Sequence, residues 1–409
     1  YKKYTGPSIT KITTNNGSEP KNIVEQITYN EFGQMTLIKR GNNTETHYTY
    51  DIKGRLTSLV TYSNSNNVLK KLQDVTYTFK VDNSIASVIN KPEQDTEGAF
   101  ASTIEYNYQY DGLNRLIHAT GSYESFKSSG TVTKKFERGY SYSSHGNLTE
   151  KRIYDPNSRM IEDRWNYTYS NHAVTSIFTL KDGNRFTMRY DAAGNMTEQG
   201  DTTANLVKYM EYDSRNRISK VSDRDTGKVI GNYYYDDQGF RIRKVATKDG
   251  ASETVEILYP SMYFGVERKR NIYNQVIPGT EYAINNVYLN GVRIAAVKPN
   301  GEARYYHTDQ VDSVKVVTDD SGMAVARMEY LPYGEQWFVE NAADVAEKHL
   351  PKYNSQEYDE ETKFYYYNAR YYDPGIARFV TPDTVIDGEK RDKNGRIIYV
   401  DTQGWNKYM

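Results

Sequence analysis

The feature that most constrains this sequence is a short motif that occurs in nine copies. Each copy starts with an aromatic residue, which we call the anchor, and Asp or Asn follows it directly in six copies. The anchors are Tyr29, Tyr50, Phe79, Tyr110, Tyr142, Tyr169, Tyr190, Tyr212 and Tyr235. Their spacings run from 21 to 32 residues, which is typical of repeat proteins whose units stack against their neighbours.

A residue suited to a tight turn stands four positions after the anchor. It is Gly or Asn in eight copies, and these residues enter the left-handed backbone region at least cost, whereas Ala173 is the exception. Before the corner, aromatic and polar residues alternate, as in 165–169, which is typical of a strand with two unlike faces. Six positions after the anchor an apolar residue follows in seven copies, but Thr175 and Arg241 break this rule. Each unit therefore predicts a strand, a corner and a second antiparallel strand.

Composition favours a curved β wall over a conventional solid core. Hydrophobic residues make up only 37% of the 409 residues, whereas Tyr alone contributes 40, and its ring can be buried while its hydroxyl bonds. A curved wall with polar surface on both sides needs fewer aliphatic residues, which hints at a hollow shape. The net charge of −1 gives no indication of bulk attraction to nucleic acid or membranes.

Features that the sequence lacks narrow the class of protein further. No apolar run approaches the length of a transmembrane helix, no signal peptide opens the chain, and the absence of cysteine excludes disulfides and thiolate chemistry. The chain starts at Tyr1 rather than Met, so we expect it to be a fragment of a longer protein.

Two segments differ in character. Residues 1–300 carry the repeats, which decay after 250, and residues 301–409 form a second segment rich in aromatic residues. Residues 341–350 are the one good helix candidate, because Asn341 can cap it and Pro351 ends it.

The repeats resemble the YD repeats of the Rhs (rearrangement hotspot) superfamily, and 303–408 resembles the Rhs-associated core domain that ends such arrays. The specific signals are Tyr-Tyr-Asn-Ala-Arg-Tyr-Tyr-Asp-Pro at 366–374 and Tyr-His-Thr-Asp at 306–309. This chain has Gln-Val-Asp at 310–312 where the family usually has His-Leu-Gly, and Asp383-Thr384 where it has Asp-Pro. The family-motif residues to which we assign structural roles are Arg370, Tyr371, Tyr372, Asp373, Pro374, Phe379, Gly404, Asn406 and Tyr408.

The resemblance implies an all-β fold in which a spiral ribbon of hairpins forms a hollow shell or part of one. It implies a plug-like core domain at 301–409 with one short helix. In relatives the shell holds a C-terminal toxic polypeptide, so the expected partner is such a cargo beyond Met409, with an N-terminal shell half or a delivery component as a second partner. An exported bacterial protein, secreted or at the cell surface, is expected. The alternative is an adhesion module that binds carbohydrate or protein without cargo, and an independent hydrolase is disfavoured.

The resemblance also implies a candidate catalytic site. Core domains of Rhs toxins resemble an aspartyl protease that cuts its own chain, for which two carboxylates must share one proton. Asp383 occupies the position of the first family aspartate, Asp401 is a possible substitute for the second, and Arg378 could keep a nearby carboxylate ionised. The structural alternative is that Asp383 caps a turn and Asp401 lies on a solvated corner.

Other chemistry is not indicated. The six histidines show no metal-ligand spacing, and no glycine loop suited to phosphate is present, so we expect neither a metal nor a cofactor. The neighbouring carboxylates Glu360 and Glu361 are interpreted as a solvated turn.

Overall fold

The computed structural model describes residues 2–5, 8–14, 20–65, 68–92, 102–127, 130–201, 207–247, 253–341, 351–383, 389–391 and 397–400. In this part of the chain the only helical element is the short 3-10 turn η1 (Tyr353–Ser355), and the rest of the regular structure is β. The helices of the described residues include none with the length and apolar character needed to span a bilayer.

Most of the strands belong to one hydrogen-bonded sheet of 28 strands within the described residues. The first half consists of β1 (Lys2–Thr5), β2 (Ser8–Thr14), β3 (Lys21–Tyr29), β4 (Met35–Arg40), β5 (Thr44–Tyr50), β6 (Leu56–Ser65), β7 (Val68–Phe79), β8 (Ile85–Asn90), β9 (Ser102–Tyr110), β10 (Leu116–Lys127), β11 (Gly130–Tyr142), β12 (Leu148–Tyr154), β13 (Ile161–Ser170) and β14 (Ala173–Thr179). The second half consists of β15 (Arg185–Tyr190), β16 (Met196–Asp201), β17 (Val207–Tyr212), β18 (Ile218–Asp223), β19 (Val229–Tyr235), β20 (Arg241–Thr247), β21 (Thr254–Ser261), β22 (Phe264–Arg270), β23 (Tyr282–Leu289), β24 (Val292–Val297), β25 (Ala303–Thr308), β26 (Val314–Thr318), β27 (Ala324–Tyr330) and β28 (Gln336–Asn341).

Two small antiparallel sheets follow the large one. The first has four strands, β29 (Glu357–Asp359), β30 (Phe364–Tyr366), β31 (Tyr371–Asp373) and β32 (Arg378–Phe379). The second has two, β33 (Glu389–Arg391) and β34 (Ile397–Val400).

The chain divides into two compact units. Unit 1 comprises 1–136, 262–265 and 282–356, and unit 2 comprises 137–261, 266–281 and 357–409.

The predicted hairpin corner is confirmed in eight of the nine copies. The anchor is the last residue of its strand in these copies, the residue six positions later starts the next strand, and the Gly or Asn between them has a positive φ. In the Tyr50 copy, the amide of Asp51 donates to Arg55 O at 3.0 Å and that of Gly54 donates to Asp51 O at 2.9 Å. The register shifts at the anchor, as in a hairpin closed by a bulge. The expectation at Ala173 was wrong, because this hairpin turns two residues earlier, at Asn171, whose φ is 53°.

The corner persists where the sequence pattern has decayed. The same closing bond, from the amide of the first turn residue to the carbonyl four positions later, occurs at Asn271, Lys298, Asp309, Asp319 and Leu331. At these corners the positive φ is taken by Asn274, Gly301, Asp312, Gly322 and Gly334. The hairpin array therefore continues to β28.

The hydroxyls of six anchors, and that of Tyr330 at the end of β27, tie a hairpin to the one before it. Tyr212 Oη donates to Met196 O at 2.6 Å, and Met196 is the first residue of the preceding return strand. The same bond, at 2.7–3.1 Å, joins Tyr29 to Ile9, Tyr50 to Met35, Tyr169 to Leu148, Tyr190 to Val174, Tyr235 to Ile218 and Tyr330 to Val314. The bulge disrupts part of the hydrogen-bond ladder between the two strands. The tyrosine hydroxyl therefore gives a carbonyl near the bulge a hydrogen-bond partner.

The Asp after the anchor organises the turn and reaches the next repeat. Asp213 Oδ1 accepts the amides of Arg215 and Arg217 at 2.9 and 3.0 Å, while Oδ2 accepts Arg217 Nε at 2.7 Å. The guanidinium of Arg217 then lies over the ring of the next anchor, Tyr235, at 4.6 Å. The Tyr-Asp pair therefore couples neighbouring units through both its residues.

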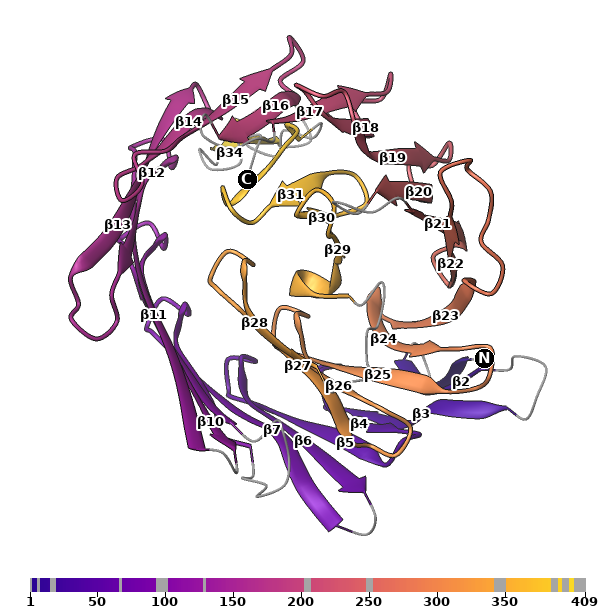
Figure 1. Cartoon of the computed structure of the whole chain (residues 1–409). Helices are drawn as coiled ribbons and strands as arrows, with labels where there is room; N and C mark the ends of the chain where they lie inside the picture. The colour runs from indigo at the N-terminus through magenta and orange to yellow at the C-terminus, as the bar shows by residue number, and fades with distance from the viewer. Residues whose placement is uncertain are drawn as a thin grey trace. The chain divides into compact units, whose positions relative to one another are not determined.

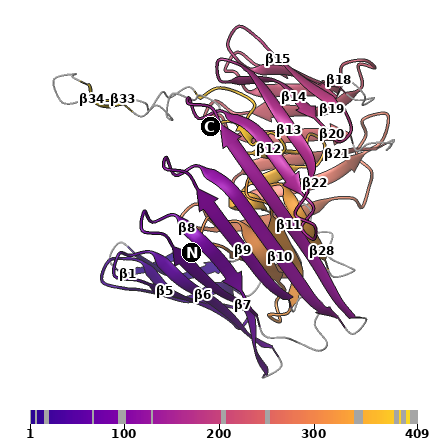
Figure 2. The same ribbon diagram turned by 90° about the vertical axis from the view of Figure 1, so that its left-hand side faces the viewer.

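Unit 1 contains a layered hydrophobic core. Strands β24, β26 and β27 are buried on both faces, and one core cluster joins Ile12, Ile23 and Ile38 to Ile294 and Ala295. Figure 1 shows β25–β27 lying alongside β3–β5, and Figure 2 shows β5–β7 of this unit side by side. Small and β-branched residues after position 290 permit this close packing.

Residues 342–350 of the predicted helix at 341–350 lie outside the described residues. Asn341, expected as its cap, is the last residue of β28.

A buried histidine in unit 1 makes the fold sensitive to acid. The side chain of His307 on β25 is 1% exposed, and its Nε2 lies 2.9 Å from Thr318 Oγ1. Burial, together with the nearby charge of Arg40, lowers the pKa of His307 well below 6.5. The unfolded chain therefore binds a proton near pH 6 that the folded chain does not.

We predict that stability falls as the pH drops through about 6.5, by up to about 1.4 kcal/mol per pH unit from this group. Urea denaturation of the wild-type chain and the His307→Gln variant between pH 7.5 and 5.5 measures this slope. The His47→Gln variant is the control, because that side chain is 46% exposed. An unchanged slope in the His307→Gln variant would show that another group causes the sensitivity.

Candidate functional site

The first predicted catalytic residue, Asp383, forms an ion pair at the end of the motif segment, residues 357–383. Its Oδ2 lies 2.8 Å from Arg370 Nη2, and its side chain is 39% exposed. The guanidinium of Arg370 also lies over the ring of Phe379, at 3.8 Å from the centroid. Burial lowers the pKa of Arg370, and the carboxylate of Asp383 acts against that shift. Asp383 is thus accessible and held by a cation.

Arg378 is buried and faces a neighbouring repeat of unit 2. Its Nη2 donates to Asn147 Oδ1 at 3.2 Å and its Nη1 to His172 O at 3.4 Å, while the guanidinium lies 5.1 Å from the Tyr169 ring. The described bonds of Arg378 therefore join the motif segment to the β11–β12 and β13–β14 corners, and the cation paired with Asp383 is Arg370.

Asp373 joins the motif segment to another repeat. Its Oδ1 accepts the amide of Gly375 at 2.8 Å and its Oδ2 accepts Gln199 Nε2 at 2.5 Å. Burial raises the pKa of Asp373, and Lys208 opposes the shift. The amide of Met196 adds a backbone bond to Val380 O at 2.9 Å.

Some of the remaining predicted residues pack within the motif segment, and the others lie outside the described part of the chain. Tyr371 is buried, and Tyr372 packs edge-on against Phe379 at 5.4 Å. Pro374 lies in the turn after β31. Asp401, Gly404, Asn406 and Tyr408 lie outside the described residues.

A buried charge cluster that the sequence analysis missed holds the start of the motif segment. Arg241 Nη1 and Nη2 lie 2.6 and 3.2 Å from Asp359 Oδ2 and Oδ1, and Lys244 Nζ lies 2.6 Å from Asp359 Oδ1. Glu357 Oε1 lies 2.9 Å from Arg241 and 3.2 Å from Lys244. The side chains of Arg241 and Asp359 are 1% and 0% exposed, so these pairs are shielded from water.

The bulge at the hairpin corner explains how both cations reach the same face. Tyr235 pairs with Arg241 and Tyr233 pairs with Lys244, because the register shifts by one residue between them. Arg241 and Lys244 are three positions apart, so regular alternation would place their side chains on opposite faces of the strand. The bulge brings both beside Tyr233 and Tyr235. Arg241 is the residue that broke the apolar rule in its repeat, and a cation at a buried strand position needs a buried anion.

The carboxylates of the cluster stabilise the charged forms of both cations. Burial alone would lower the pKa values of Arg241 and Lys244, but the carboxylates led by Asp359 outweigh it and raise both. Burial raises the pKa of Glu361, whose Oε1 lies 3.6 Å from Lys244. Three carboxylates thus share two cations.

The solvated-turn interpretation of Glu360 and Glu361 was half wrong. Glu360 is 63% exposed and pairs with Lys363, but the Glu361 side chain is 6% exposed and accepts the Tyr233 hydroxyl at 3.0 Å. Glu361 lies toward Lys244 and Tyr233 whereas Glu360 pairs with Lys363, so the two carboxylates are separated.

Tyrosine hydroxyls complete the contact between the motif segment and β19–β20. Tyr366 Oη accepts the amide of Arg241 at 2.9 Å, and Tyr371 Oη accepts Arg241 Nη1 at 3.2 Å. The hydroxyls of Tyr235 and Tyr371 lie 2.9 Å apart. The segment 357–383 is therefore docked on several repeats of unit 2, and its exposed end presents Asp383.

Comparisons with known proteins place these features among YD-repeat proteins. A family model described as Teneurin YD-shell matches residues 286–398. The chain is 25% identical over 429 residues to Toxin subunit YenC1 of Yersinia entomophaga, covering 95% of this chain and 43% of that protein. It is 26% identical over 289 residues to the tRNA3(Ser)-specific nuclease WapA of Bacillus spizizenii, covering 70% of this chain and 11% of the nuclease. The chain thus spans less than half of the length of either relative.

A solved structure has the same fold. The TcdB2-TccC3-Cdc42 crystal structure aligns with 98% of this chain and 20% of its own, with a TM-score of 0.76 and 21% identity. The all-β expectation is confirmed by this match and by the 28-stranded sheet of the described residues.

The charge cluster yields a stability prediction. Asp359→Asn leaves Arg241 and Lys244 buried with too little negative charge, so we expect a loss of roughly 3–5 kcal/mol in the stability of unit 2. Hydrogen exchange of β19–β20 and of 357–373 measures it. Glu360→Gln, at the next residue of the chain, is the matched control, for which we expect a change within about 0.5 kcal/mol. Equal effects of the two substitutions would contradict the structural role assigned to Asp359.

Proposed function

We propose that this chain, a YD-repeat protein of the Rhs superfamily, is the wall and end domain of a shell that holds a toxin polypeptide continuous with its own C-terminal side. The observation that carries the proposal is the alignment of 98% of the chain with a structure containing TccC3. Two relatives, by name a toxin subunit and a tRNA nuclease, support an association with toxic polypeptides. Secretion or display at the cell surface, with residues 301–409 as the end domain, forms part of the proposal.

The docking of the motif segment supports a role in presenting the chain for release. Ion pairs and hydroxyl bonds fix 357–373 against β19–β20 through Asp359 and Tyr371, whereas the side chain of Asp383 is 39% exposed. A rigidly held strand that leads to an accessible carboxylate is suited to positioning a peptide bond.

Self-cleavage is the finer part of the proposal. In an aspartyl-type reaction one carboxylate takes a proton from water, whose oxygen adds to the peptide carbonyl carbon. The other carboxylic acid gives its proton to the departing amine as the C–N bond breaks. We assign Asp383 to one of these roles and Arg370 to positioning it, and Asp401 remains the candidate for the second carboxylate. The role proposed for Arg378 is to fix the segment against Asn147.

The match to the Teneurin YD-shell model favours a second candidate, an adhesion module without cargo. The two candidates differ in one property: a cargo shell protects a polypeptide from added protease, and an adhesion module does not.

We predict that Asp383→Asn abolishes self-cleavage in the full-length gene product, because the amide cannot exchange the proton. Mass spectrometry of the purified protein detects uncut and cut chains, and trypsin resistance of the polypeptide after Met409 tests encapsulation. The control is Asp225→Asn, which removes the same charge from an exposed turn. Normal cutting in the Asp383→Asn variant would rule out the protease assignment, and rapid digestion of the downstream polypeptide would rule out the shell.

A further inference from the structure

One contact of the buried charge cluster in unit 2 joins an amine to a carboxyl group across two distant strands. Lys244 Nζ on β20 lies 2.6 Å from Asp359 Oδ1 on β29, and the two side chains are 6% and 0% exposed. Buried Tyr233, Tyr366 and Tyr371 hydrogen-bond to other members of the cluster and help to exclude water from it. An acyl group and a nucleophilic atom are therefore held together in a dry site.

Condensation of these two groups would remove two charges from a place that is shielded from water. Taking an ammonium and a carboxylate out of water carries a large desolvation cost, which their mutual attraction offsets only with good geometry. An amide is neutral and can stay buried when its polar atoms are hydrogen-bonded. Arg241 would keep Glu357 as a partner at 2.9 Å.

The neighbouring groups are placed to move the protons that this reaction requires. Lys244 is an ammonium in the cluster, so its nitrogen must lose a proton before it attacks, and Glu357 Oε1 lies 3.2 Å away as the base. Glu361 lies 3.6 Å from Lys244. Burial raises the pKa of Glu361, which suits that carboxyl group to giving a proton to a departing oxygen. The guanidinium of Arg241, 2.6 and 3.2 Å from the two oxygens of Asp359, stabilises negative charge that develops on them.

From the buried contact, the flanking carboxyl groups and the exclusion of water, we infer that Lys244 and Asp359 condense to an intramolecular amide after the chain has folded. Nζ of Lys244 gives a proton to Glu357 and bonds to Cγ of Asp359. The nitrogen then gives a second proton to Glu361 as the C–O bond breaks. The departing oxygen takes one proton from each glutamate and leaves as water.

The reaction balances without a co-reactant. One ammonium and one carboxylate become one amide and one water molecule, and both glutamates return to their starting state. The inference is independent of cargo and of self-cleavage.

The amide would give a chain without cysteine a covalent cross-link. The two residues are 115 positions apart, and cross-links that close long loops remove the most entropy from the unfolded chain. The bond would also keep the motif segment attached to β20 when the ion pairs of the cluster are lost.

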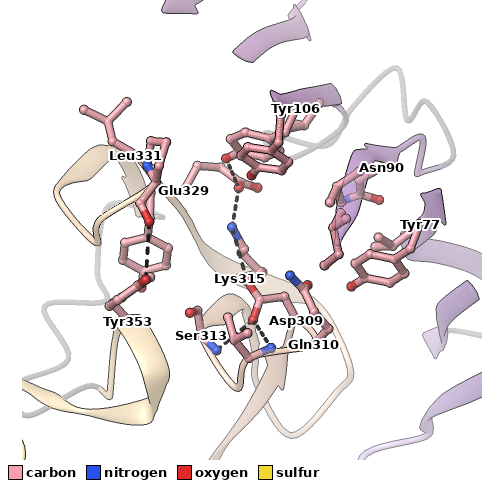
Figure 3. Close-up of a pocket in the computed structure, with 18 of the residues that line it drawn as sticks. Tyr77, Asn90, Tyr106, Asp309, Gln310, Ser313, Lys315, Glu329, Leu331 and Tyr353 are labelled. Atoms are coloured by element: carbon pink, nitrogen blue, oxygen red, sulfur yellow. Dashed lines mark hydrogen bonds and ion pairs between the residues drawn. The ribbon is translucent and has the colours of Figure 1, made fainter. Parts of the chain in front are cut away.

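Unit 1 contains a similar lysine contact in a wetter place, which provides an internal control. Lys315 Nζ lies 2.8 Å from Glu329 Oε2 and 3.7 Å from Asp309 Oδ2. These three residues line part of a cavity of about 230 Å³ (Figure 3), and a polar space of this size holds water that solvates the ammonium. Lys315 is also 14% exposed. We therefore expect no amide at Lys315.

Mass spectrometry of the purified 409-residue chain, folded and then denatured for the measurement, tests the inference. The wild-type chain should be lighter than its sequence mass by one water molecule. Digestion should release one branched peptide that joins Lys244 to Asp359. Lys244→Arg should have its full sequence mass, and Glu361→Gln should form the bond more slowly by at least about tenfold.

The matched control is Lys315→Arg, which should still lack one water molecule and still give the same branched peptide. Circular dichroism identifies any variant that fails to fold, and the wild-type mass decides the question without a variant. The inference is overturned if the folded wild-type chain keeps its full sequence mass. It is also overturned if the lost water maps to a linear peptide, as in a cyclised aspartate, or if Lys244→Arg still lacks the water.

Discussion

The rest of the structure depends on the hydrogen bond from an anchor tyrosine to a carbonyl of the preceding hairpin, which six of the anchors make. A hairpin closed by a bulge loses part of its ladder at the corner, and the hydroxyl of the next repeat restores a partner there, as Tyr212 does for Met196. Arg217 adds a contact to the following anchor ring. Few aliphatic residues are then needed along the wall, because each repeat is fixed by directional bonds at its corner.

The site arises from one altered repeat. Where seven of the other repeats place an apolar residue six positions after the anchor, the Tyr235 repeat has Arg241, and the anchor hydroxyl bonds to Tyr371 as well as to Ile218. The motif segment therefore docks at the corner of this hairpin, where the anchor hydroxyl also bonds to the preceding hairpin. A buried pair of Arg241 with Asp359 contributes little net stability over an apolar pair, but it fixes which segment docks and in which register.

Much of this fold could be predicted from the sequence, because each corner needs Gly or Asn at one offset and each strand alternates. The turn at Asn171 was missed, since a two-residue corner leaves no residue at the expected offset. The charge cluster was missed for a different reason: Arg241 and Asp359 are 118 residues apart, and no local pattern connects them. The break in the apolar rule at Arg241 was the available signal.

The central claim is tested most directly by removing several anchor hydroxyls together. A variant with Tyr50, Tyr190 and Tyr212 changed to Phe should lose about 1 kcal/mol at each anchor, and hydrogen exchange of the strands around them should quicken, by up to about a hundredfold if the losses combine. The control changes the exposed Tyr209, Tyr234 and Tyr273 to Phe and should leave exchange near the wild-type rate. If the two triple variants exchange alike, the anchor hydroxyls do not hold the array together.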